Sequence, residues 1–128
     1  MLQKLHYHSS QSVKNPVFSI LIPSWNNLNY LQLCVNSIRK NSSLNHQIII
    51  ILNEATDGSL EWVKQQKDLD YVHAEDNIGI CYGLNSTRKL MQAHYVLYAN
   101  DDMYFLPDWD HYLKQEIDSI GHSSFMLS

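Results

Sequence analysis

The sequence contains little of what marks disulfide-rich, membrane-spanning or nucleic-acid-binding proteins. Its 128 residues include only two cysteines, Cys34 and Cys81, which lack the CxxC spacing of a zinc or redox site. Its longest aliphatic run, residues 48–52, is too short to cross a bilayer. A formal net charge of -4, with no basic tract, argues against a general nucleic-acid binder. We therefore expect a cytoplasmic protein, at most peripheral to a membrane, with free buried thiols and with neither a transmembrane segment nor a nucleic-acid partner.

The chain is long enough for one domain but short for an enzyme with two substrates. Residues 1–15 are a polar leader, containing His6 and His8, that we expect to be poorly ordered. Residues 16–128 make up the folded domain. The seven histidines show no spacing typical of metal ligands.

From residue 16 onwards, short apolar runs alternate with segments of helical periodicity. The runs predict strands over residues 16–23, 47–52, 70–74 and 94–99, and the periodic segments predict helices over residues 28–40, 59–67 and 80–93. This order predicts an α/β sandwich with a mainly parallel sheet. Its ligands should bind beyond the carboxyl ends of the strands.

Two helix starts can be predicted from single residues. Asp57 is a candidate N-cap for the helix at 59–67, and Pro107 suits the first turn of a last helix. That last helix has an apolar stripe along one side. Three acidic residues of this segment, Asp108, Asp110 and Glu116, are expected on its solvated side.

An acidic turn follows the strand at 94–99. Asn100 and Asp102 are two residues apart and share a side, whereas Asp101 can join them only if the chain turns. Mg²⁺ takes oxygen ligands, commonly one or two carboxylates together with substrate phosphates, so Asp102 suits a metal-diphosphate site. The alternative is a polar turn without a ligand, because Asn and Asp favour turns.

The loops after the first two strands should meet this acidic turn at one edge of the sheet. Trp25 is either a stacking surface for a nucleobase or a core residue. Asn53 and Glu54 either hydrogen-bond a base or ribose or simply form a turn. Gly79 and Gly83 permit a close approach of backbone to ligand, but they lack the GxGxxG spacing.

Four segments in this order resemble the motifs of glycosyltransferase family 2. They are FSILIPSWN at 18–26, ILNEATDGS at 51–59, NIG at 77–79 with Asn85, and LYANDD at 97–102 followed by LPDW at 106–109. The resemblance implies a GT-A fold, a nucleotide-diphosphate-sugar donor and a divalent metal, Mn²⁺ or Mg²⁺, held at a DxD motif. By position it implies that Asp102 binds the metal and that the donor contacts Pro23, Ser24, Trp25, Asn53, Glu54, Asn85, Asn100 and Asp101.

The chain departs from the family pattern in ways that affect function. Asn53 replaces the usual aspartate, and Leu84 stands where many relatives have arginine. The family's catalytic base lies in a later, acceptor-binding half that this sequence does not include, so no base can be named. We expect the donor-binding half of an inverting glycosyltransferase, whose acceptor is a glycan, lipid or protein and whose activity needs more polypeptide or a partner subunit. The alternative is a truncated or non-catalytic module that binds a nucleotide or another protein.

Overall fold

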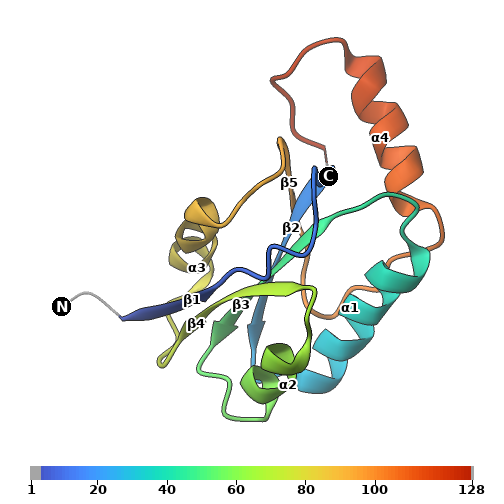
Figure 1. Ribbon diagram of the computed structural model, residues 1–128. Helices are drawn as coiled ribbons and strands as arrows, with labels where there is room; N and C mark the ends of the chain where they lie inside the picture. Colours follow the sequence, from blue (N-terminus) through green and yellow to red (C-terminus); the bar gives the residue numbers. More distant parts are fainter. Residues whose placement is uncertain (1–3, 128) are drawn as a thin grey trace.

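A computed structural model describes residues 4–127 as an α/β protein built around one five-stranded sheet (Figure 1). The elements are β1 (Leu5–His8), β2 (Phe18–Trp25), α1 (Leu28–Asn41), β3 (Gln47–Asn53), α2 (Ser59–Gln65), β4 (Leu69–Ala74), α3 (Ile80–Ser86), the short 3-10 helix η1 (Thr87–Lys89), β5 (Tyr95–Tyr98) and α4 (Trp109–Ile120). The strand order is β1-β4-β3-β2-β5. Among the helices described, none combines the length and the apolar character needed to span a membrane.

The sheet is parallel except for β1. Strand β2 pairs in parallel with both β3 and β5, and β3 pairs in parallel with β4, whereas β1 runs antiparallel to β4. The expectation of a mainly parallel α/β sandwich is therefore confirmed. Because β2, β3 and β5 point the same way, the loops that follow them meet at one edge of the sheet.

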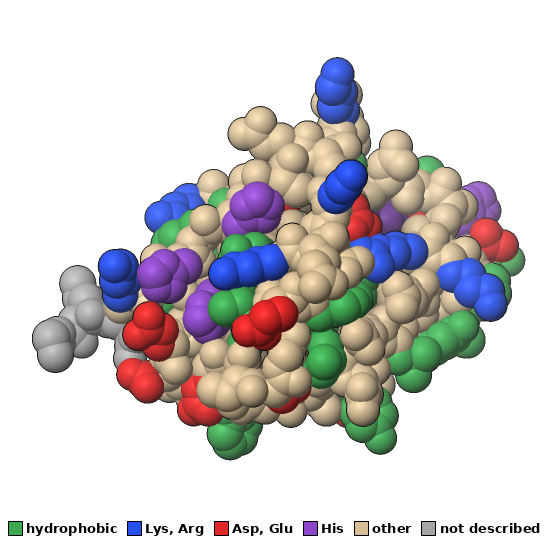
Figure 2. Space-filling model, turned by 60° about the horizontal axis from the view of Figure 1, so that its bottom comes forward, with side chains coloured by type: hydrophobic (Ala, Val, Ile, Leu, Met, Phe, Trp, Pro, Cys, Tyr) green, Lys and Arg blue, Asp and Glu red, His purple; other side chains and the backbone are tan. Residues whose placement is uncertain are grey.

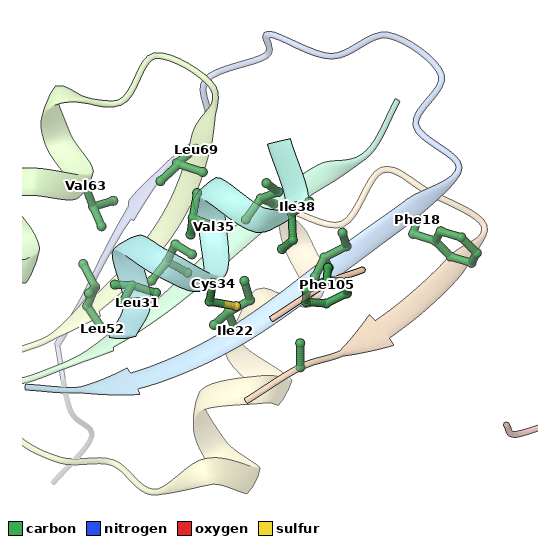
Figure 3. Close-up of a cluster of buried hydrophobic side chains, with 14 of the residues drawn as sticks. Phe18, Ile22, Leu31, Cys34, Val35, Ile38, Leu52, Val63, Leu69 and Phe105 are labelled. Carbon is green, nitrogen blue, oxygen red and sulfur yellow. The ribbon is translucent and has the colours of Figure 1, made fainter. Parts of the chain in front are cut away.

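Side chains alternate between the two faces of the sheet, and each face has its own core. On one face, α1, α2 and α4 cover the larger core, which includes Phe18, Ile22, Leu52 and Phe105 (Figure 3). On the other face, α3 and η1 cover a smaller core that contains Ile49. Figure 1 shows α1 and α3 on opposite sides of the sheet. The long aliphatic strands β2 and β3 are buried on both faces, as expected for central parallel strands.

The polar leader is not poorly ordered along its whole length, so that prediction is wrong. Residues 5–8 form the edge strand β1, in which His6 lies opposite His73 and His8 lies opposite Tyr71. Both pairs stack their rings, with centroids 6.0 Å apart in the first pair and 5.2 Å apart in the second. Cross-strand pairing between aromatic rings thus stabilises a strand that has almost no aliphatic character. Figure 2 shows histidine side chains gathered beside the N-terminus.

Other differences from the sequence predictions are local. The helix predicted over 80–93 ends at Ser86, and η1 follows; the Thr87 hydroxyl donates to the Leu84 carbonyl. Cys34 is buried, as predicted. Cys81 is exposed on α3, so the prediction of a buried thiol is wrong for this residue. Asp57 accepts from the amide and hydroxyl of Ser59, at the start of α2.

The expectation that Asp110 is a surface charge is also wrong. Asp110 is fully buried, and its carboxylate accepts hydrogen bonds from the backbone amides of Ser43 and Leu44, at 3.0 and 2.7 Å. His46 Nε2 lies 2.7 Å from the same carboxylate. These donors come from the connection between α1 and β3. Helical periodicity could not reveal them, because they lie more than sixty residues away in the sequence.

Candidate functional site: a pocket at the carboxyl edge of the sheet

A pocket of about 450 Å³ opens at the carboxyl ends of β2, β3 and β5. Its lining residues come from four loops and strand ends that are far apart in the sequence. They are Pro23, Ser24, Trp25, Asn27, Asn53, Asn77, Gly79, Ile80, Tyr98, Asn100, Asp101 and Asp102. The pocket therefore brings together all the residues predicted for the site except Glu54 and Asn85.

The end of β2 provides one wall of the pocket through alternating side chains. Ser24 is buried, whereas Trp25, the last residue of the strand, is 58% exposed. The core alternative for Trp25 is thereby ruled out. An exposed indole beside a polar pocket offers a flat apolar face on which a planar ring can stack.

The acidic turn provides a second wall, and its side chains are held by hydrogen bonds from two different residues. The Ser24 hydroxyl donates to Asp101 Oδ2 at 2.9 Å, and the Tyr98 hydroxyl donates to Asn100 Oδ1 at 2.7 Å. Asp102 is exposed and makes no hydrogen bond to other residues within the range 4–127. The turn therefore leaves one carboxylate free to take a ligand.

The backbone of this turn and of the segment that follows it is fixed to α1. The Cys34 thiol contacts the Asn100 carbonyl at 3.7 Å, the Ser37 hydroxyl accepts from the Phe105 amide at 2.9 Å, and the Asn41 amide donates to the Phe105 carbonyl at 2.6 Å. Ser37 and Asn41 are both buried. Their positions on the inner side of α1 are explained by these bonds, since a buried loop backbone needs hydrogen-bond partners.

The two carboxylates of the acidic turn create a negative electrostatic potential around them. Burial, together with the negative charges of Asp101 and Asp102, raises the pKa of the Cys34 thiol to about 11. Cys34 therefore stays a neutral thiol at physiological pH. Its side chain packs in the core and does not serve as a nucleophile, because only the thiolate form is reactive.

The loop after β3 places Asn53 and Glu54 differently. Asn53 is buried in the pocket wall, and its side-chain oxygen accepts from the Ile78 amide at 2.9 Å. Glu54 and Ala55 both adopt left-handed backbone conformations, with φ of 60° and 65°. The chain turns sharply there, and Glu54 does not line the pocket. Its carbonyl instead accepts a hydrogen bond from the His73 ring.

The start of α3 forms the remaining wall. Gly79 has a φ of 76°, and a Cβ built on it would meet nothing within 4 Å, so this glycine fits the predicted close approach to a ligand. Gly83 does not have that role. A Cβ on Gly83 would lie 3.0 Å from Ile51 Cγ2, which shows that its function is to let α3 pack on the sheet. Asn85 is exposed on α3, outside the pocket.

Several lining residues were not singled out as site residues from the sequence, namely Asn27, Asn77, Ile80 and Tyr98. Tyr98 had a usable signal. It precedes Asn100 by two positions at the end of a strand, so the two side chains share one side of the chain.

The acidic turn is chemically suited to a hard divalent cation. No group of three or more His, Cys, Asp or Glu side chains within residues 4–127 could enclose a metal ion. Two carboxylates and an amide on an open wall match the way Mg²⁺ binds, because it keeps several waters and shares its remaining positions with substrate phosphates.

Comparison with solved structures identifies the architecture. The crystal structure of S. aureus TarS 1-349 in complex with UDP matches 80% of this chain with a TM-score of 0.72 and 22% identity. The mannosyltransferase PcManGT from Pyrobaculum calidifontis, solved with GDP-Man and Mn²⁺, matches 88% of it with a TM-score of 0.64 and 15% identity. This protein therefore has the GT-A fold, as predicted.

Sequence comparison assigns the chain to a family within this fold. Residues 19–128 match the model of glycosyl transferase family 2, and the chain belongs to this family. TuaG of Bacillus subtilis, a protein named for teichuronic acid biosynthesis, is 28% identical over 91 residues, which are 68% of this chain and 36% of TuaG. Glycosyltransferase GlyA of Streptococcus pneumoniae is 27% identical over 103 residues, 77% of this chain and 15% of GlyA. The chain thus spans about a third or less of the length of these relatives and of the matched structures.

Proposed function

We propose that the pocket binds a nucleotide-diphosphate-sugar through a divalent metal, and that the chain is the donor-binding part of an enzyme that transfers the sugar to an acceptor. One observation carries the proposal: an exposed tryptophan and a free carboxylate line the same pocket at the carboxyl edge of a parallel sheet. The complexes of the structural neighbours with UDP and with GDP-Man and Mn²⁺ support it.

Different residues of the pocket bind different parts of the donor. Trp25 stacks on the nucleobase, and Asn53 offers polar groups beside it. Asp102 holds the metal, assisted by Asp101, whose carboxylate is already oriented by Ser24. A bound divalent cation supplies neutralisation of the charge that develops on the leaving diphosphate. Gly79 leaves room for the donor to approach the backbone.

Transfer to a hydroxyl also requires a general base within reach of the acceptor. Asp101 and Asp102 are the only carboxylates lining the pocket within residues 4–127, and the proposal assigns both to the donor. We therefore expect turnover to need a base from further polypeptide or from a partner subunit. The donor sugar and the acceptor are to be found by screening.

The test is calorimetric titration of UDP, GDP, CDP and ADP into the purified chain, with Mn²⁺ and with chelator. We expect one nucleotide to bind in a metal-dependent manner. Asp102→Asn should abolish the metal dependence and leave the thermal unfolding midpoint unchanged, because the Asp102 side chain is exposed. Asp118→Asn, which changes an exposed carboxylate on α4, is the matched control.

Two outcomes would contradict the proposal. Unchanged metal-dependent affinity in Asp102→Asn would remove Asp102 from the metal site. Failure of every nucleoside diphosphate to bind the folded wild-type chain would favour a module that interacts with another protein.

A further inference from the structure

We infer that Tyr98 is a positioning residue of the donor pocket, which turns the side-chain amide of Asn100 so that its NH₂ group faces the bound donor. The inference rests on the proposed function, because it describes how that same pocket holds its ligand. Neither the sequence motifs nor the acidic turn by itself assigns a role to Tyr98.

The geometry of the strand end brings the two side chains together. Tyr98 is the last residue of β5, and Asn100 follows it by two positions. Between them Ala99 is buried, and its amide donates to the Leu21 carbonyl at 3.0 Å, which fixes the backbone at this point. Tyr98 and Asn100 are therefore held on the same side of the chain, and both line the pocket.

The hydrogen bond between them determines which end of the amide is free. The Tyr98 hydroxyl donates to Asn100 Oδ1 at 2.7 Å, so the oxygen of the amide is engaged. The NH₂ group makes no hydrogen bond within residues 4–127 and remains a donor at the pocket wall. A phosphate or hydroxyl oxygen of the nucleotide is an acceptor that such a donor can bind.

A neutral donor at this position complements the two carboxylates beside it. Asp101 and Asp102 attract a cation, but they repel the phosphate oxygens of the same ligand. The Asn100 NH₂ group offers those oxygens a direct hydrogen bond next to the metal site. The Tyr98 hydroxyl is the group that prevents the amide from turning its own oxygen towards them.

The test compares Tyr98→Phe, Asn100→Ala and the double variant by titration with the nucleoside diphosphate that binds the wild type. Tyr98→Phe removes only a hydroxyl from a side chain that is 44% exposed, so the fold should be unaffected. We expect each single variant to lower the nucleotide affinity by about three- to tenfold, the usual effect of losing one hydrogen bond. The double variant should bind as Asn100→Ala does, because Tyr98 acts through Asn100.

Two further measurements separate positioning from other roles. The Mn²⁺ concentration that gives half-maximal nucleotide binding should be the same in Tyr98→Phe and in the wild type. Tyr112→Phe, a change at an exposed tyrosine of α4 outside the pocket, should leave the affinity unchanged.

The inference is overturned if Tyr98→Phe binds as tightly as the wild type, if the effects of the two single changes add in the double variant, or if Tyr98→Phe changes the Mn²⁺ requirement. Each of these results leaves the proposed function in place as long as the wild-type chain binds the nucleotide. Absence of binding to the wild type overturns the proposed function itself.

Discussion

Among single residues, Asp110 shows how one buried carboxylate can join two distant segments. Its hydrogen bonds from Ser43, Leu44 and His46 fasten the first turn of α4 to the connection between α1 and β3. Burial by itself would raise the pKa of Asp110, but the hydrogen bonds of these three residues outweigh it and lower the pKa to about 2. The carboxylate is therefore ionised at neutral pH.

His46 is the neutral partner in this pair. Burial lowers its pKa below 6.5, although the hydrogen bond to Asp110 opposes the shift. Its Nδ1 atom is buried and has no hydrogen-bond partner among residues 4–127. Protonation would place an unpaired N–H at that position, which is unfavourable in a low-dielectric interior. The ring therefore donates from Nε2 to Asp110 and stays uncharged.

These two shifts predict how stability depends on pH. As the pH falls below 6.5, the unfolded chain protonates His46 before the folded chain does, so the free energy of unfolding should decrease. The stabilisation from Asp110 is fully present above pH 3.8 and should be lost as the pH falls towards about 2. Denaturant titrations at a series of pH values measure both effects.

Substitution separates the Asp110 contribution from that of other carboxylates. Asp110→Ala leaves the amides of Ser43 and Leu44 without an acceptor, and we expect a loss of about 3 kcal/mol at pH 7. Asp118→Ala, at an exposed site, should change stability by about 0.5 kcal/mol or less. Equal stability of the two variants would show that the buried hydrogen bonds contribute nothing.

Among the elements, α1 and the segment after β5 act as one unit. Asn41 donates to the Phe105 carbonyl, and its own backbone carbonyl accepts from the Asp108 amide at 2.9 Å. Together with Ser37, these bonds hold the segment that carries Asp101 and Asp102 against the helix. The position of the two carboxylates therefore depends on Ser37 and Asn41, two polar residues of α1 that do not line the pocket themselves.

Asn41→Ala tests this dependence. Loss of the donor leaves the buried Phe105 carbonyl unpaired, which should reduce the free energy of unfolding by about 1–3 kcal/mol. Metal-dependent nucleotide affinity should fall as well, since the segment bearing the acidic turn is less firmly held. Asn36→Ala, at an exposed position of the same helix, is the control for helix propensity. Unchanged stability and affinity in Asn41→Ala would show that the segment is held by other contacts.

The elements also differ in how far the sequence predicts them. The aliphatic runs of β2 and β3 and the helical spacing of α1 are strong local patterns, so these elements and the parallel order follow from them. Strand β1 has no such local pattern. It is stabilised by ring pairs with β4, which is far away in the sequence. Within the site, the rule that parallel strands end at the same edge of the sheet correctly predicts that the acidic turn lies near Trp25. It does not predict the left-handed backbone conformation of Glu54, which keeps this residue out of the pocket lining.

For the whole molecule, the two edges of the sheet are protected to different degrees. On one side the edge strand is β1, which pairs with β4, and Lys89 lies over its Tyr7 ring with the Nζ atom 3.3 Å from the centroid. On the other side β5 pairs with β2 alone within residues 4–127. Val96, at 54% exposure, stands on this edge strand without a charged neighbour in β5. An edge strand of apolar residues that lacks charge is a template for pairing with another chain.

We therefore predict that the isolated chain associates with itself through β5 as its concentration rises. Val96→Lys should raise the concentration at which association begins, because a lysine on an edge strand opposes strand addition. Val96→Thr keeps the β-branched shape without the charge and is the matched control. Val96 does not line the pocket, so both variants should bind nucleotide as the wild type does. Sedimentation velocity over a range of concentrations measures the effect, and equal behaviour of Val96→Lys and the wild type would exclude β5 as the associating edge.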